Sequence, residues 1–237
     1  MIGLNHERPG EEWRARLRLP AYQVGEAARY TGVSAQTVAF WHRMGGRAAA
    51  TLSTRESRAA LSYLQLIEVA VVAAFRKAGV SLKRIRDARN YVSKELKSDF
   101  PFADYRFKTN GKRLWVDYEE IEGEKGRGKL IGVDRQGQLA WGEILGRLKE
   151  FEYENGGIAV RWRVGGQSSP VVIDPRISFG APAVRGTATW ILKGRWDAGE
   201  RVSDIASDFD LKLPEVRKAL EFEGIAPTPE QARKWTH

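Results

Sequence analysis

The sequence predicts an α+β fold in three parts, with helical segments at both ends of the chain and a β-rich segment between them. Apolar residues recur at helical spacing between residues 22 and 97, and again after residue 187. Between residues 100 and 175 the period changes to two, with turn residues separating the runs. We therefore expect domains at residues 1–98, 99–175 and 176–237.

The N-terminal part begins with two short helices joined by a tight turn. The first helix has an apolar stripe, formed by Val24, Ala27 and Ala28. Thr31-Gly32-Val33 interrupts the stripe, and Ser34 suits the N-cap of a second helix, whose inward residues are Val38 and Trp41. This pattern is typical of a helix-turn-helix.

Two longer helices follow a stretch rich in glycine, arginine and small residues. The first is expected from about residue 58 to Lys77 and ends before Gly79, which suits the position after a helix. The second starts at Ser81 and has one apolar face, formed by Leu82, Ile85, Ala88, Val92 and Leu96. Basic residues occupy its other faces.

The middle segment has the turn signals of a β structure. Asn110-Gly111 lies between strand-like flanks in residues 107–116 and predicts a hairpin. Further turns are expected at residues 134–137 and 154–157, and residues 158–164 alternate as a strand does. One short helix is expected around residues 141–149.

The C-terminal part is expected to fold as a three-helix, helix-turn-helix-like unit. The first helix is expected from Thr189 to Asp197, and the second from about Val202 to Phe209. The third begins at Pro214, because proline suits the first position of a helix. Residues 197–223 contain four Lys and Arg against eight Asp and Glu. An acidic unit repels phosphates, so this one favours a protein partner.

Charge is distributed unevenly along the chain. Residues 1–100 hold 17 Lys and Arg against 9 Asp and Glu, whereas the remaining residues hold 22 against 21. A positive field at one end is what a phosphate-binding module needs, although solubility alone is the simpler alternative. Together with the helix-turn-helix, it predicts binding of double-stranded DNA.

Other classes of protein find little support. The chain has no Cys, its three His have no metal-ligand spacing, and no phosphate-binding loop or nucleophile elbow occurs. We therefore expect no catalysis, no metal and no cofactor. The first 18 residues lack the apolar segment of a signal peptide, and the apolar run Val69 to Phe75 is too short to cross a membrane. We expect a cytoplasmic protein.

The candidate DNA-binding residues come from the second helix and from the basic stretch after it. Side chains at the start of that helix can reach base edges in the major groove, whereas those after it would approach the sugar-phosphate backbone. The base-reading candidates are Ser34, Ala35, Gln36 and Thr37, and the backbone candidates at the helix end are His42 and Arg43. A purely structural helix pair is the alternative.

This region resembles the MerR-like winged helix-turn-helix. The resemblance runs through Glu26-Ala27-Ala28, Thr31-Gly32-Val33-Ser34, Thr37 and Trp41, and continues in residues 61–68 and 79–86. It implies that residues 45–57 form a wing, with phosphate contacts from Arg47, Arg55 and Arg58. Ala39 departs from the family, which often has an arginine there. The long dimerisation helix of the family is also missing, so dimerisation must differ.

The last part of the chain resembles the C-terminal module of VapB-type antitoxins of PIN-like ribonuclease toxins. The resemblance covers residues 172–187, then Ile205-Ala206-Ser207-Asp208-Phe209, Val216 and Ala219-Leu220. Taken alone, the glycines and proline of this stretch indicate only a tight turn leading into helices. The two modules together resemble full-length antitoxins of this kind.

The resemblance implies that the chain binds and blocks a PIN-like toxin and represses its own operon. Such nucleases hold divalent metal with clustered carboxylates, so a cationic side chain suits their site. Arg233, Lys234 and Trp235 are candidates for this contact, and a frayed basic tail is the alternative.

We expect a homodimer on operator DNA, because one recognition helix reads only a half-site. The alternative function is a stand-alone MerR-like regulator whose β-rich domain binds a ligand.

Overall fold

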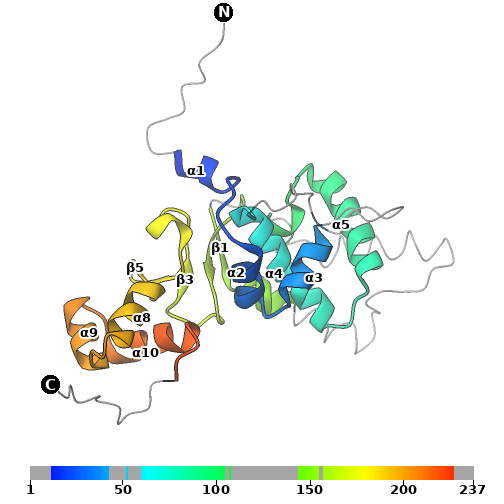
Figure 1. Cartoon of the computed structure of the whole chain (residues 1–237). Coiled ribbons are helices and arrows are strands. Elements are labelled where there is room, and N and C mark those ends of the chain that lie inside the picture. Colours follow the sequence, from blue (N-terminus) through cyan, green and yellow to red (C-terminus); the bar gives the residue numbers. More distant parts are fainter. Residues whose placement is uncertain are drawn as a thin grey trace, which may run out of the picture. The chain divides into compact units, whose positions relative to one another are not determined.

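The computed structural model of the chain describes residues 12–42, 52, 60–104, 107, 144–154 and 157–226. It divides into two compact units, residues 1–160 and 161–237. The α+β class is confirmed, with helices toward both ends of the chain and a sheet of five short strands (Figure 1). The division into three domains stays a prediction.

Unit 1 is organised around a buried central helix. Its elements are α1 (Glu12–Arg16), α2 (Val24–Thr31), α3 (Ala35–Trp41), α4 (Tyr63–Lys77), α5 (Leu82–Leu96) and the 3-10 helix η1 (Pro101–Ala103). All but three of the 15 residues of α4 are buried. A helix that is apolar on nearly every side belongs in a core, and α2, α5 and η1 pack against it (Figure 1).

The start of α4 corrects the sequence prediction, which placed it near residue 58. Ser62 caps the helix: its Oγ accepts a hydrogen bond from the Gln65 N–H at 3.3 Å, and Gln65 Oε1 accepts one from the Ser62 N–H at 2.8 Å. Immediately before the cap, Leu61 pairs with Tyr22 in an isolated antiparallel bridge, so its backbone is extended. The following helix, α5, begins after Ser81 as predicted.

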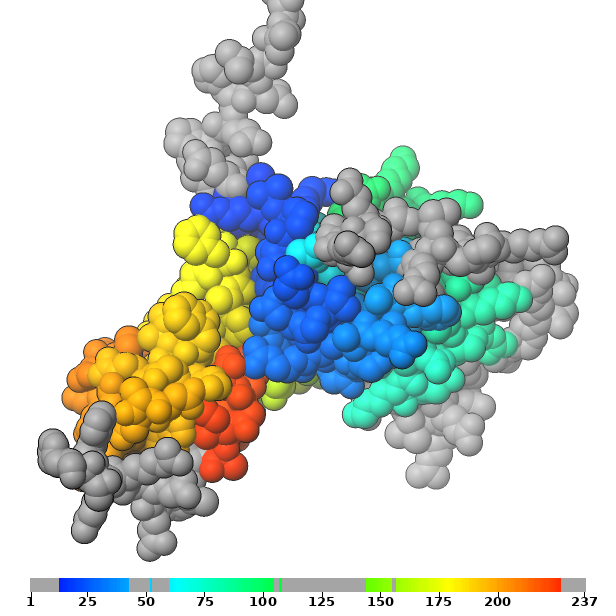
Figure 2. All heavy atoms as spheres, in the orientation of Figure 1, coloured from blue at the N-terminus to red at the C-terminus, as the bar shows by residue number. Residues whose placement is uncertain are grey.

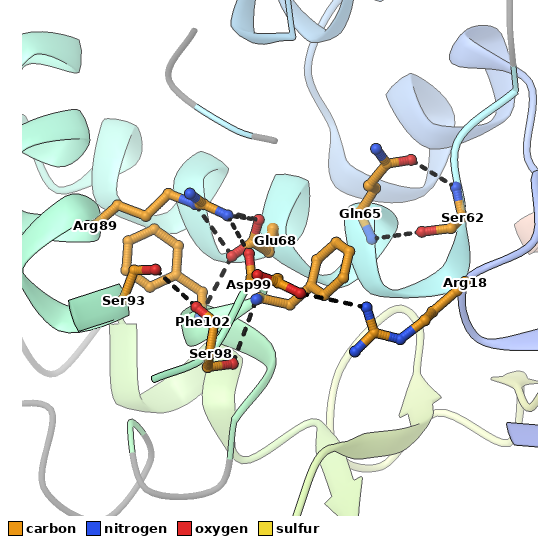
Figure 3. A network of polar contacts seen from close by, with 10 residues as sticks. Arg18, Ser62, Gln65, Glu68, Arg89, Ser93, Ser98, Asp99 and Phe102 are labelled. Carbon is orange, nitrogen blue, oxygen red and sulfur yellow. Dashed lines mark hydrogen bonds and ion pairs between the residues drawn. The ribbon is translucent and has the colours of Figure 1, made fainter. Parts of the chain in front are cut away.

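A buried ion pair joins the elements packed on α4. Glu68 is completely buried, and its carboxylate accepts hydrogen bonds from Arg89 on α5 (Figure 3). The Phe102 N–H of η1 lies 3.5 Å from Glu68 Oε1, and Arg89 Nη2 also donates to the Asp99 carbonyl at 2.6 Å. Burial raises the pKa of Glu68, while the positive charge of Arg89 opposes that rise.

The sheet has five strands in sequence order: β1 (Phe151–Tyr153), β2 (Ala159–Arg163), β3 (Val172–Ile173), β4 (Ala183–Val184) and β5 (Thr187–Ala188). The three pairs from β2 to β5 are antiparallel. The predicted run at 158–164 contains β2, and residues 144–148 are helical as expected. Phe107 is helical and buried, so its prediction as a strand residue is wrong. The rest of that hairpin, like the turn at 134–137, lies outside the described residues.

In unit 2 a tight hairpin leads into three helices. Arg185 and Gly186 both have positive φ, 47° and 93°, and connect β4 to β5 as a two-residue type I′ turn. The 3-10 helix η2 (Ser178–Gly180) precedes the hairpin, and α8 (Thr189–Asp197), α9 (Val202–Asp208) and α10 (Leu213–Phe222) follow it. All three helices lie where the sequence predicts them.

Polar contacts hold the three helices of unit 2 together. Arg195 of α8 pairs with Glu200 and Asp208, and its guanidinium lies 5.5 Å from the ring centre of Phe209. Thr189 Oγ1, at the start of α8, donates to Glu223 Oε1 beyond α10 at 2.5 Å. The first and last helices are thereby joined, and the apolar faces of all three meet between them.

Candidate nucleic-acid interface

The helix-turn-helix is formed by α2, a three-residue turn and α3. Gly32 ends α2 with φ 73°, a left-handed conformation that glycine adopts without steric cost, and its N–H donates to the Ala28 carbonyl at 2.9 Å. Ser34 starts α3, and its Oγ accepts the Thr37 N–H at 3.1 Å. Both ends of the turn are therefore fixed by local hydrogen bonds, as the sequence predicts.

The inner side of α3 is anchored in the core of unit 1. Val38 and Trp41 are buried and face α2 and its neighbours. Leu52 is buried as well, and its N–H donates to the Trp41 carbonyl at 3.1 Å. Because these contacts fix the helix axis, the outer side chains of α3 have defined positions.

The four predicted base-reading residues share the start of α3 but differ in what their side chains can do. Ser34 Oγ and Thr37 Oγ1 lie 2.8 Å apart and already hydrogen-bond each other. Ala35 and Gln36 are exposed. Within the described part of the chain, the Gln36 amide has no hydrogen-bond partner. Gln36 is therefore the polar side chain of the four that is most available to a base edge.

His42 is buried, whereas the sequence predicts that it contacts a phosphate. Its side chain is only 3% exposed, because it follows Trp41 into the interior at the end of α3. The other candidates lie outside the described residues: Arg43, Arg47, Arg55, Arg58, Arg233, Lys234 and Trp235.

A hollow of about 560 Å³ opens beside α3. Its polar lining comes from Ser34, Gln36, Thr37 and Arg76, and its apolar lining from Val33, Phe40, Trp41 and Leu82. Arg76 is in the last turn of α4, and Leu82 starts α5. Figure 2 shows the blue surface of α2 and α3 next to the blue-green surface of α4 and α5 on one face of this unit.

Five residues of this hollow were not among the DNA-binding candidates of the sequence: Val33, Phe40, Trp41, Arg76 and Leu82. Phe40 could have been found from its place four residues after Gln36, which puts both on one side of a helix. Arg76 and Leu82 are at least 35 positions away from α3, and only the packing of α4 and α5 brings them there.

Unit 2 exposes two aromatic side chains of its own. Phe179 in η2 is 85% exposed and has a left-handed φ of 54°, and Trp190 in the first turn of α8 is 64% exposed. The Ser178 hydroxyl donates to the Gly186 carbonyl at 2.9 Å and so attaches η2 to the turn of the hairpin. Exposed aromatic residues on an ordered backbone are typical of protein-binding surfaces.

The described residues contain neither a metal-binding cluster nor a membrane-spanning helix. Among them, no group of three or more His, Asp or Glu side chains is arranged to hold a metal ion. No helix in the same residues has the length and apolarity to cross a membrane.

Comparison with known families identifies the region that contains this site. Residues 22–91 match the family described as MerR HTH family regulatory protein. This match begins at the Tyr22 bridge, covers the helix-turn-helix and α4, and ends within α5. A second family, described as a protein of unknown function (DUF433), matches residues 171–222, from β3 to the end of α10.

Two relatives are similar along most of the chain. The protein named Putative antitoxin VapB45 from Mycobacterium tuberculosis is 27% identical over 233 residues, which cover 89% of this chain and 97% of that protein. The crystal structure of Rv2018 from Mycobacterium tuberculosis superposes with a TM-score of 0.68 and 24% identity, covering 86% of this chain and 99% of that one. This second likeness shows that the two chains share a fold.

Proposed function

We propose that this chain is the antitoxin of a type II toxin-antitoxin pair, which binds a PIN-like ribonuclease toxin and represses its own operon through α3. The observation that carries the proposal is the similarity to the antitoxin relative, which extends over 97% of that protein and 89% of this chain. The proposed role requires binding only, with no catalysis by this chain.

The DNA-binding part of the proposal is supported by the geometry of α3 and by charge. Gln36 is exposed on a helix whose opposite side is anchored by Val38 and Trp41. Exposed cationic side chains lie at the junction of α4 and α5, namely Arg76, Lys77 and Lys83. Such charges supply the non-specific attraction to phosphates, while Gln36 supplies a hydrogen-bond pattern that suits adenine.

The toxin-binding part is supported by the chemistry of unit 2. Its helices carry the net negative charge described above, which disfavours nucleic acid, and its surface exposes Phe179 and Trp190. We assign toxin contact to this unit, with Arg233, Lys234 and Trp235 as the residues that approach the carboxylates of the nuclease. A homodimer would present two copies of α3 to the two halves of a symmetric operator.

Binding of the full-length chain to genomic DNA tests the first half of the proposal. Retention on a DNA column should fall steeply as salt rises, since phosphate contacts release counterions. A selection from random duplexes should then yield a two-fold symmetric sequence. Retention that does not respond to salt, or a selection without a preferred sequence, would contradict DNA recognition.

Co-expression tests the second half. We expect a gene for a small PIN-like protein beside the gene for this chain, and growth arrest by that protein should be relieved when this chain is co-expressed. The two proteins should co-purify as one complex. A version of the chain that stops after Ile225 should bind DNA normally and relieve the arrest less. Full relief by the shortened chain would remove the tail from the proposal, and the absence of any complex would remove the antitoxin role.

A further inference from the structure

The most unusual side chain of the candidate DNA-binding helix is an aromatic ring that faces solvent. Phe40 is 55% exposed, although it stands beside the buried Trp41. A solvated aromatic ring on a seven-residue helix contributes little to the fold, because much of its apolar surface stays in contact with water. We therefore expect the Phe40 ring to act by contacting a binding partner.

Phe40 shares one side of α3 with Gln36. Residues four apart on a helix are neighbours, and both of these side chains line the hollow beside α3. The remaining apolar lining of the hollow comes from Val33, Trp41 and Leu82, so that Phe40 belongs to an apolar strip next to a polar amide.

A cationic side chain borders the same hollow. Arg76 Nη1 donates to the Val80 carbonyl at 2.6 Å, which holds the guanidinium beside the α4–α5 turn. The guanidinium group has five N–H donors, and this contact uses one of them. A fixed cation beside a polar amide and an apolar ring suits a partner that is anionic and also carries a small apolar group.

Double-stranded DNA has such a group in its major groove. Among the base-pair edges only thymine presents a methyl group there, and phenylalanine is one of the side chains that contact it. We propose that Phe40 is a specificity-determining residue that recognises the 5-methyl group of a thymine in the operator. This inference rests on the proposed DNA-binding function and adds a base preference that Gln36 does not supply.

The helix geometry sets where that thymine lies. Four residues of an α-helix span about 6 Å. Successive bases of one strand are about 3.4 Å apart along the helix axis. The thymine read by Phe40 therefore lies within about two base pairs of the base contacted by Gln36.

Deoxyuridine isolates this contact, because it differs from thymidine only by the missing methyl group. A duplex selected by the full-length protein is prepared with each thymine replaced singly by deoxyuridine, and its dissociation constant is measured at fixed salt. One position in each half-site should weaken binding by about fourfold, the value expected for one buried methyl group. For Phe40→Ala the same replacement should change nothing.

Leu19→Ala is the matched control. Leu19 is also 55% exposed and lies in the same unit, but it is outside α3. This variant should keep the deoxyuridine penalty in full. Thermal unfolding of both variants checks that they are folded. The deoxyuridine series measured with the unaltered protein tests the contact even if Phe40→Ala does not fold.

The outcomes separate this inference from the function on which it rests. A preferred duplex whose affinity no deoxyuridine changes would overturn the role of Phe40 and leave DNA recognition intact. If Phe40→Ala still lost affinity when that thymine is replaced by deoxyuridine, the role of Phe40 would also be overturned and DNA recognition would stand. If the full-length protein selects no sequence at all, both the proposed function and this inference fail.

Discussion

The carboxylate of Glu68 and the guanidinium of Arg89 form a paired hydrogen-bond contact inside unit 1. Arg89 Nη2 lies 2.8 Å from Glu68 Oε2, and Arg89 Nε lies 3.2 Å from Oε1 (Figure 3). Both side chains are almost entirely removed from solvent. The pair joins α4 to α5, and through the Phe102 N–H it reaches η1 as well. This buried contact thus joins the two helices that line one side of the hollow, in addition to their apolar packing.

Removal of Arg89 should destabilise the protein strongly. Arg89→Ala leaves the Glu68 carboxylate buried without its cation, and breaking one side of such a pair costs about 3–5 kcal/mol. Arg89→Lys keeps the charge but not the two-pronged contact, so its cost should be smaller. The free energy of unfolding from urea titrations measures both.

The exposed pair of Arg18 and Asp99 provides the control for this prediction. Their N–O distance is 3.6 Å, and both side chains are mostly exposed. Solvent screening limits such pairs to less than about 1 kcal/mol, so Arg18→Ala should be nearly neutral. Equal losses in Arg18→Ala and Arg89→Ala would contradict the importance assigned to burial.

The stability should depend on pH through Glu68. Burial raises the pKa of this carboxyl above its usual value of 4.5, so the folded protein holds the proton more tightly than the unfolded chain does. The contribution of Glu68 to stability is therefore complete below about pH 4.5 and declines as pH rises through the pKa of the folded state.

Glu68→Gln provides the measurement, because glutamine resembles the protonated acid and does not titrate. The free energy of unfolding of the unaltered protein, minus that of Glu68→Gln, should decrease as pH rises above 4.5. An increase over the same range would mean that the attraction of Arg89 exceeds the effect of burial.

The sequence predicted those parts of the fold that are set by nearby residues. Gly32, Ser34 and Ser81 end or begin helices through contacts within a few positions, and their roles follow from local chemistry. The Glu68–Arg89 pair joins residues 21 positions apart, and no local pattern distinguishes it from two surface charges.

The candidate site was predicted only in part for the same reason. Gln36 follows from its place at the start of α3, but the burial of His42 depends on how that helix packs at its other end. Arg76 reaches the hollow through the packing of α4.

The strands β4 and β5 have two residues each, which is too short for an alternating pattern to be recognised.

Base reading and phosphate contact should respond differently to substitution. Gln36→Ala should cost about 1–3 kcal/mol of binding free energy on the preferred duplex and less on random DNA, because it removes hydrogen bonds to a base. Thr37→Ala should act in the same direction. Arg47→Ala should weaken binding to both duplexes about equally and reduce the salt slope by about one. Fluorescence anisotropy at several salt concentrations measures these quantities. If the Gln36 and Arg47 variants each lost as much affinity for random DNA as for the preferred duplex, the assigned roles would be refuted.

Two glycines of unit 2 should respond in opposite directions to the same substitution. Gly186 has φ 93° in the β4–β5 turn, where an added Cβ would meet no other atom, so any cost of Gly186→Ala comes from the backbone alone. We expect a loss of about 1 kcal/mol. Gly194 lies inside α8, and an added Cβ meets nothing within 4 Å there either. Gly194→Ala should therefore raise stability by about 0.5–1 kcal/mol, since alanine favours the helix.

Thermal unfolding of the full-length variants distinguishes these two effects. Because neither added methyl group contacts a neighbour, a destabilising effect of Gly194→Ala would show that α8 is not a regular helix at that point. A neutral Gly186→Ala would likewise contradict the left-handed turn.

The Gly194→Ala variant also tests toxin binding. Gly194 is exposed on α8 four residues after Trp190, so both residues lie on one side of the helix. If this side of α8 contacts the toxin, Gly194→Ala should weaken the complex while it raises the melting temperature, which is a combination that loss of folding cannot produce.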